Sequence, residues 1–187
     1  PDPAAATVSR KRTCNSPLTT WAQRTTLASA SQGGPMGVAP ELIADLCNQL
    51  HADPWICIPH QADDLYVTNL ATLLRDRLDP TLRIRIEYSN EIWGTFTQSD
   101  WARQQGMALA LSSDPTTAGL RFQARRSVEI FDIFEKVFGG RTRLIRVLAA
   151  SHANPSTGVT VMSWNNASAK ADEFATAPYF GGNLGNA

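Results

Sequence analysis

Short apolar segments alternate with longer amphipathic segments from residue 39 onward, and this alternation constrains the fold more than any other feature of the chain. The pattern predicts strands at 55–58, 82–89, 143–150 and 173–182, and helices at 40–50, 62–79, 101–111 and 118–140, with a shorter helical stretch at 167–171. A helix between two strands implies a crossover connection, so successive strands run parallel. We therefore expect an α/β domain of βα repeats, either a small open sheet or half of an eight-stranded barrel.

The composition agrees with one folded domain over residues 39–187. The 187 residues are 43% hydrophobic and 18% charged, and the formal net charge is zero. This balance argues against nucleic acid as a partner held by bulk electrostatics. Residues 1–38 are rich in Pro, Ala, Ser, Thr and Gly and predict an irregular N-terminal region with a short helix at 21–28. No apolar run approaches the roughly 20 residues of a membrane span, and no signal peptide is visible.

The cysteine and glycine patterns indicate no cofactor. Cys14, Cys47 and Cys57 lack the spacing of a metal site, and no phosphate-binding glycine motif follows a predicted strand. Cys47 and Cys57 are expected as small core residues, although one disulfide could form. His60 and His152 would need a third ligand to hold a metal ion, and the sequence offers none, so we expect no metal.

Each predicted strand ends in polar or aromatic residues. The strand ends carry His60, Asn90 with Glu91, His152 and Tyr179. Taken singly, each has an ordinary explanation, since a histidine after a strand is usually a loop or cap residue. The carboxyl ends of parallel strands share one rim, where functional residues of α/β folds collect. We therefore predict a binding or catalytic site on that rim.

Glu91 has the most specific chemistry of these residues. Asn90 offers an amide to a substrate hydroxyl, and Trp93 offers a flat apolar face to a sugar ring. Trp164 is a second candidate platform, although packing is the commoner role of a tryptophan. A carboxyl group sheltered by aromatic side chains has a raised pKa and can donate a proton at neutral pH, as the general acid of a glycosidase does.

The segment 52–94, ADPWICIPHQADDLYVTNLATLLRDRLDPTLRIRIEYSNEIWG, resembles a family of bacterial secreted carbohydrate-active proteins labelled cellulose-binding or glycoside hydrolase-like. Members carry PHQADDxYV and VEYSNEVWN motifs at the same separation. The Asn–Glu strand end also resembles the clan of retaining glycosidases with a (β/α)8 barrel of the TIM type. The resemblance implies a partial barrel in a secreted hydrolase that degrades β-1,4-glycans such as cellulose or xylan. It also implies that Glu91 is the acid/base, Asn90 a substrate ligand, Glu87 a supporting residue and Tyr179 a residue near the sixth strand end.

The chain departs from this clan in its second carboxylate. If Glu91 ends the fourth strand of such a barrel, Tyr179 ends the sixth, and the sequence stops before the strand that carries the clan's nucleophile. We expect Asp63 or Asp64, which follow the first predicted strand, to supply the second carboxyl group. A second copy of the chain, paired at the open sheet edges, is the other route. The alternatives to a hydrolase are a carbohydrate-binding module without catalysis and an inactive fragment of a larger glycosidase.

Overall fold

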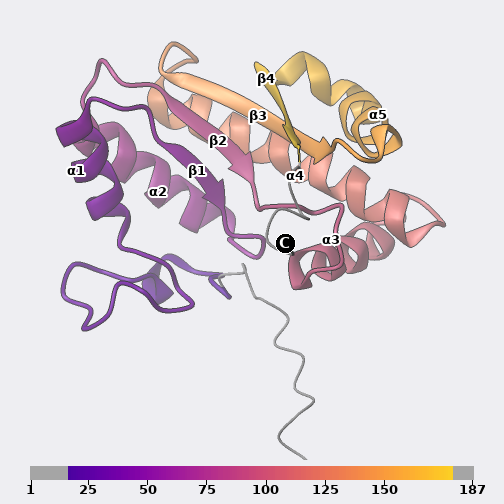
Figure 1. Cartoon of the computed structure of the whole chain (residues 1–187), viewed down its shortest axis with the longest axis horizontal. Helices are drawn as coiled ribbons and strands as arrows, with labels where there is room; N and C mark the ends of the chain where they lie inside the picture. Colours follow the sequence, from indigo (N-terminus) through magenta and orange to yellow (C-terminus); the bar gives the residue numbers. More distant parts are fainter. Residues whose placement is uncertain (1–16, 179–187) are drawn as a thin grey trace, which may run out of the picture.

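Four parallel strands form the sheet, and helices connect them in the predicted alternation (Figure 1). The computed structural model describes residues 17–178. The strands are β1 (Trp55–Ile58), β2 (Ile84–Tyr88), β3 (Leu144–Ser151) and β4 (Glu173–Ala177). The α-helices are α1 (Pro40–Leu50), α2 (Asp64–Arg77), α3 (Thr97–Ala108), α4 (Pro115–Phe138) and α5 (Pro155–Ser163), and the 3₁₀ helices include η2 (Trp21–Gln23) and η3 (Trp164–Lys170).

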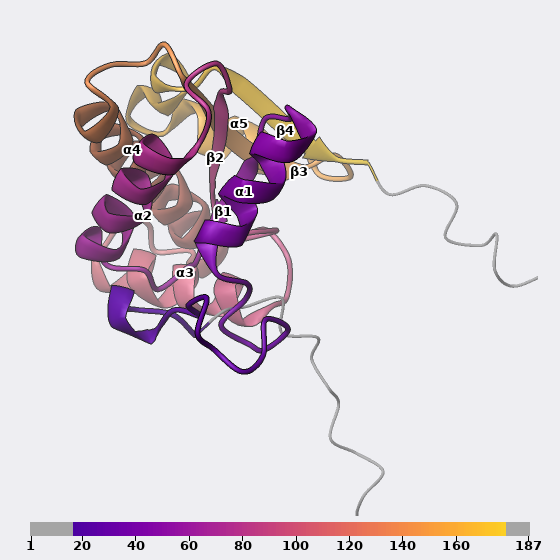
Figure 2. The same cartoon turned by 90° about the vertical axis from the view of Figure 1, so that its left-hand side faces the viewer.

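The strands lie in chain order, β1-β2-β3-β4, and every neighbouring pair is parallel. Because crossovers between parallel strands are right-handed, a sheet wound in one direction receives its connecting helices on one face. Figure 2 shows α2, α4 and α5 on one side of the sheet, with α1 beside the β1 edge. The predicted α/β class with parallel βα repeats is confirmed, and the described residues form a four-stranded sheet.

The sheet face beneath the helices carries the main core. Side chains alternate between the two faces along each strand, so every second residue points toward the helices. In β1, β2 and β3 these residues are almost all large and apolar, and they are buried: Ile56, Ile58, Ile84, Ile86, Leu144 and Leu148. The buried side chains of α2 and α4, such as Leu74 and Phe134, pack against them. Burying one side chain of this size stabilises the fold by roughly 1.5–3 kcal/mol.

Arg146 is the exception on this apolar face, where it lies in register with Ile86. It is only 2% exposed. Its Nε and Nη2 donate to the two carboxylate oxygens of Asp172 at 2.8 and 2.9 Å, and its Nη1 donates to Glu135 Oε1 at 2.7 Å. A buried cation needs such partners, because burial removes its hydration. The cluster ties β3 to α4 and to the residue that precedes β4.

Local signals in the sequence explain where the long helices begin and end. Asp63 caps α2, because its Oδ1 accepts from the Tyr66 N–H at 2.6 Å. Asp114 caps α4 in the same way, through Thr117 N–H at 2.7 Å. Helix α4 ends at Gly139, whose φ of 70° is the left-handed conformation that glycine adopts without strain.

Several predicted bounds are shifted, such as the helix expected at 101–111, which is α3 (Thr97–Ala108), and two elements differ in kind. The helix expected at 21–28 is the three-residue η2, yet residues near it join the fold, since Leu18 is buried and the Trp21 ring meets the edge of Tyr66 at 5.4 Å. Helix α5 was not predicted, although Asn154 and Pro155 form an ordinary helix start. Its valine and threonine residues have low helix propensity, so the sequence of this segment does not indicate a helix.

Candidate functional site

The turn after β2 holds Glu91 in a fixed position. Ser89 and Glu91 have φ values of 58° and 50°, a left-handed conformation that is uncommon for residues other than glycine. Gln98 Nε2 donates to the Asn90 carbonyl at 2.8 Å, and Ser99 Oγ donates to the Glu91 carbonyl at 3.4 Å. Both donors lie in the first turn of α3 and are fully buried. A strained turn persists only where its surroundings impose it, which is common at functional sites.

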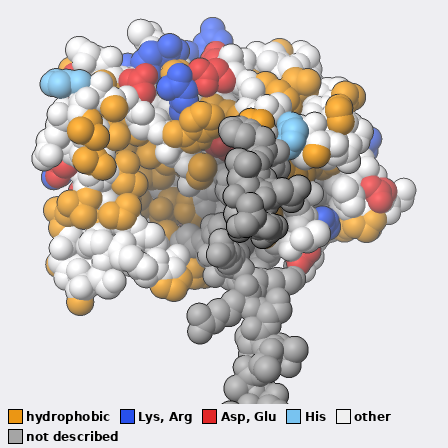
Figure 3. All heavy atoms as spheres, viewed as in Figure 1, with side chains coloured by type: hydrophobic (Ala, Val, Ile, Leu, Met, Phe, Trp, Pro, Cys, Tyr) orange, Lys and Arg blue, Asp and Glu red, His pale blue; other side chains and the backbone are white. Residues whose placement is uncertain are grey.

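The sheet face opposite the helices bears charged and aromatic side chains. Strand register places Trp55 and Cys57 of β1, Arg85 and Glu87 of β2, and Glu173 of β4 on this face, which we call the open face. Figure 1 views the sheet from this side, with α4 passing behind the strands. In Figure 3, charges of both signs gather above the amino ends of the strands, and apolar side chains gather beside β1.

An ion pair crosses the open face from β2 to β4. The Nε and Nη2 of Arg85 donate to the two carboxylate oxygens of Glu173 at 3.0 and 3.1 Å. The Nη1 of Arg85 lies 3.8 Å from Asp53 Oδ2. Because β3 lies between these two strands, the pair passes over it. This cover accounts in part for the burial of Ile145 and Val147, which belong to the open face and are 2% and 0% exposed.

Glu87 is the buried carboxyl group of the open face. It is 8% exposed, and one of its oxygens accepts a hydrogen bond from the Trp55 indole N–H at 2.9 Å. Burial, with a smaller contribution from the charge of Glu91, raises the pKa of Glu87 to about 7 against the lowering effect of the Trp55 hydrogen bond. Glu87 therefore holds its proton up to neutrality, and it interacts electrostatically with Glu91.

The two histidines predicted at strand ends lie just after the carboxyl ends of β1 and β3. His60 follows β1 and is 5% exposed; its ring meets the edge of Trp101 at 6.1 Å, and burial lowers its pKa. The Gln61 amide contacts His60 Nε2 at 3.1 Å, which suits a neutral ring with its proton on Nδ1. His152 follows β3, and its Nδ1 contacts the carbonyl of Ala177 at the end of β4. Tyr179 lies outside the described residues.

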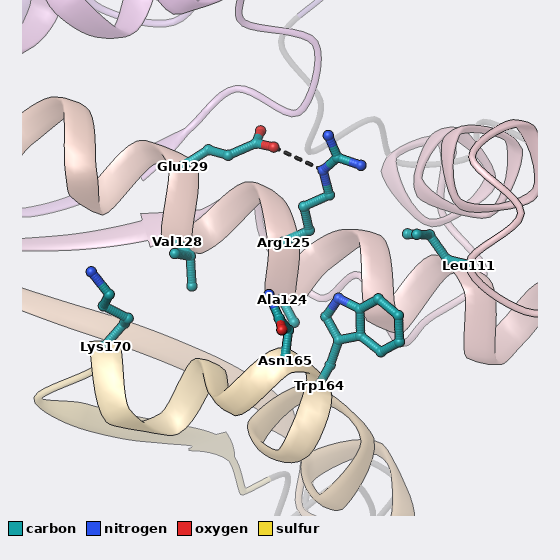
Figure 4. A pocket seen from close by; sticks show the side chains of 8 residues that line it. All are labelled: Leu111, Ala124, Arg125, Val128, Glu129, Trp164, Asn165 and Lys170. Carbon is teal, nitrogen blue, oxygen red and sulfur yellow. Dashed lines mark hydrogen bonds and ion pairs between the residues drawn. The ribbon is translucent and has the colours of Figure 1, made fainter.

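The two predicted tryptophan platforms pack against the helix side of the molecule. Trp93 and Trp164 are both half-buried against the hydrophobic cluster that contains Leu148 and Phe131. The guanidinium of Arg121 lies 4.8 Å from the centre of the Trp164 ring. Trp164 also lines a separate cavity between α4 and η3 (Figure 4). The structure does not bring these indoles to the open face, where the half-exposed indole is Trp55.

Asp63 and Asp64 take part in interactions typical of a helix N-terminus. Asp63 caps α2, and Asp64 Oδ1 forms an ion pair with Arg126 Nη1 at 2.7 Å. Arg126 belongs to α4, on the helix-covered side. The charge of Glu91 contributes to the raised pKa of Glu87, which makes Glu87 the candidate partner of Glu91 on the open face.

Trp55 and Glu87 are the site residues that sequence reasoning undervalued. The sequence contains a signal for both residues. Trp55 and Cys57 alternate with Ile56 and Ile58, which puts them on the opposite face of the strand, and a glutamate inside a strand is uncommon unless it has a partner. Only the strand register shows that Trp55 reaches Glu87. Cys57 was expected in the core and is instead exposed on the same face, in register with Glu87.

No family model, curated protein or solved structure matches the chain. Among residues 17–178, no helix is long and apolar enough to cross a membrane. Nor do the described histidine, cysteine, aspartate and glutamate side chains include a group of three placed to hold a metal ion. The geometry of the open face and of the β2–α3 turn is therefore the basis for assigning a function.

Proposed function

We propose that the chain is a glycoside hydrolase domain whose carboxyl pair is Glu87 and Glu91. The observation that carries the proposal is the placement of the two groups: Glu87 is a buried carboxyl group whose pKa burial raises to about 7, and Glu91 lies four residues later on a turn that α3 holds. The glycan class, a β-1,4-linked chain of the cellulose or xylan type, comes from the resemblance of segment 52–94 to secreted carbohydrate-active proteins.

The different environments of the two carboxyl groups suggest their roles. Two carboxyl groups in different environments can divide into an acid and a base. Glu87 keeps its proton and would protonate the glycosidic oxygen, while Glu91, half-buried at the rim, would act on water or on the sugar. This assignment moves the acid role from Glu91, where the resemblance puts it, to Glu87. Asn90 and the half-exposed Trp55 would bind the sugar.

One observation favours carbohydrate binding without hydrolysis as a second function. Glu87 is only 8% exposed and is held by the Trp55 indole, so it presents little surface to a glycan. Trp55, at 48% exposure, would then serve as a stacking platform whose orientation Glu87 fixes. In that case Glu87 would only orient Trp55 and would take no part in catalysis.

Reducing-sugar release from soluble β-glucan and xylan separates these two functions. We expect Glu87→Gln and Glu91→Gln each to lower kcat/KM by at least about 10²-fold, the contribution of a general acid or base. Asp76→Asn, which alters an exposed carboxylate of α2, is the matched control and should leave the rate unchanged. Release that survives both glutamine variants would remove the pair from the mechanism. Retention on insoluble cellulose without release would support the binding function.

The proposal includes a barrel architecture for the complete site. Strands β1 and β4 are each paired on one side only among the described residues, and a sheet wound in one direction curves toward closure. A second copy could supply the remaining strands, because open edges favour pairing with an identical chain. Sedimentation velocity tests this point: a dimer supports completion by a second copy, and a monomer at all concentrations contradicts it.

A further inference from the structure

A second concave site lies on the helix-covered side, away from the open face. Its cavity of about 410 Å³ lies between α4 and η3, within the roughly 300–1,000 Å³ of small-molecule sites (Figure 4). Trp164 and Asn165 line it from η3, Val128 lines it from α4, and Leu111 closes it from the segment after α3. The proposed hydrolase function does not use this cavity.

The backbone at Asn165 and Asn166 directs one amide into the cavity. Both residues are left-handed, with φ values of 45° and 58°, and they interrupt the helical path of η3. Asparagine is among the few residues other than glycine that adopt this conformation readily. Asn165 lines the cavity and its neighbour does not. Figure 4 shows the Asn165 side chain beside the Trp164 indole, so an aromatic surface and an amide are presented together.

The charges around the cavity are paired, which favours a neutral ligand. Arg125 Nε lies 2.8 Å from Glu129 Oε1, and Lys170 Nζ lies 3.3 Å from Asp132 Oδ1. Arg125, Glu129 and Lys170 line the cavity, so it offers donors and an acceptor at its rim. Arg121 is engaged with the Leu111 carbonyl at 2.6 Å. An anion would have to displace existing carboxylate partners, whereas hydroxyl groups can share them.

We propose that this cavity is a second binding site for a neutral sugar, in which Trp164 supplies the apolar surface and Asn165 binds hydroxyl groups. A sugar ring has an apolar face and a rim of hydroxyls that both donate and accept, which matches an indole flanked by an amide and an ion pair. The choice of a sugar agrees with the proposed function, but binding here needs neither Glu87 nor Glu91.

The test is a cellobiose titration followed by methyl NMR in a Glu91→Gln background, where the probe is not consumed. We expect shifts at Val128 and Leu111, which line the cavity, and none at Val147, which lies on the open face. Asn165→Gly removes the amide and suits the left-handed backbone, so it should weaken binding about tenfold without loss of stability. Asn166→Gly makes the same backbone change outside the cavity and should leave the affinity unchanged.

Three results would overturn the assignment of this cavity as a binding site. They are no cellobiose binding at millimolar concentrations, equal effects of the two glycine variants, and shifts confined to Val147, which would move the probe to the open face. Tighter binding of glucuronate than of cellobiose would contradict the proposal that the ligand is a neutral sugar. Binding at Val128 by a chain that releases no reducing sugar would support this site while contradicting the hydrolase function, so the two proposals fail separately.

Discussion

The two faces of the sheet are made by the same four strands but differ in the polarity of their side chains and in how these side chains are stabilised. Beneath the helices, alternate residues such as Ile86 and Ile58 are fully buried and apolar. On the open face, the residues between them include Glu87, Arg85 and Trp55. Neighbouring residues of one strand therefore have different roles. A substitution at Ile86 should change the free energy of unfolding, whereas one at Glu87 should change the chemistry of the open face.

The two central arginines sharpen this contrast. Arg146 and Arg85 lie on adjacent strands, and each binds a carboxylate through Nε and Nη2. The Arg146 side chain is 3% exposed on the helix side, while the Arg85 side chain is 29% exposed on the open face. An arginine–carboxylate pair therefore occurs twice in one sheet, once with a buried cation and once with a partly exposed cation, and the energy of the two pairs should differ accordingly.

The largest expected effect comes from deleting a core side chain on the helix side. Ile86→Ala should lower the free energy of unfolding by about 4 kcal/mol, because it removes buried methylenes and leaves a cavity. Cys57→Ala, on the exposed open side of β1, should change it by less than about 1 kcal/mol. Urea unfolding monitored by circular dichroism measures both. Equal losses would show that the open face is also a packed core, and Ile86→Val, at about 1 kcal/mol, serves if the alanine variant does not fold.

The second comparison replaces each arginine with methionine, which keeps most of the volume and removes the charge. We expect Arg146→Met to cost about 2 to 3 kcal/mol, since it removes the charge-assisted hydrogen bonds of a buried cation to two carboxylates, Glu135 and Asp172. Arg85→Met should cost less than about 1 kcal/mol, because solvent can replace the lost partner of Glu173. Similar losses in chemical denaturation would contradict the dielectric contrast between the faces.

The sequence predicted the helix side of this molecule better than the open face. Runs such as 84–88 carry the alternation that defines a strand, and the caps at Asp63, Asp114 and Gly139 follow general rules, so the element order was accessible. The pairing of Trp55 with Glu87 depends on register between strands that lie 32 residues apart, which no local pattern encodes. Trp93 and Trp164 were expected as sugar platforms, and both indoles pack partly buried against a hydrophobic cluster, which their place in the sequence does not reveal.

The third prediction concerns the pH dependence that Glu87 gives to stability. Its pKa rises from 4.5 to about 7 on folding, so the folded chain binds more protons than the unfolded chain between these values. Stability from this group is therefore complete below pH 4.5 and declines as pH rises through 7, by about 3 kcal/mol in total. Glu87→Gln should remove this decline, because the amide stays neutral and still accepts from Trp55.

Urea midpoints of the two proteins from pH 4.5 to 8 measure this difference. The control is Glu173→Gln, on the same face, whose carboxylate is paired with Arg85 and exposed to solvent. A constant gap between Glu87→Gln and the unsubstituted protein across this range would mean that Glu87 is ionised throughout, and the acid role proposed for it would then have no proton to donate.

The smallest expected effect uses Cys57 as a reporter of the neighbouring carboxylate. Burial of its sulfur, and then the charge of Glu87, raise the pKa of the Cys57 thiol, although the residue as a whole is exposed. In a chain whose Cys14 and Cys47 are replaced by serine, a thiol reagent should therefore label Cys57 slowly at pH 8, and Glu87→Gln should accelerate labelling about threefold by removing the negative charge. At pH 5.5 Glu87 is already protonated, so the two rates should converge. An acceleration of equal size at both pH values would place the cause in packing and not in the charge of Glu87.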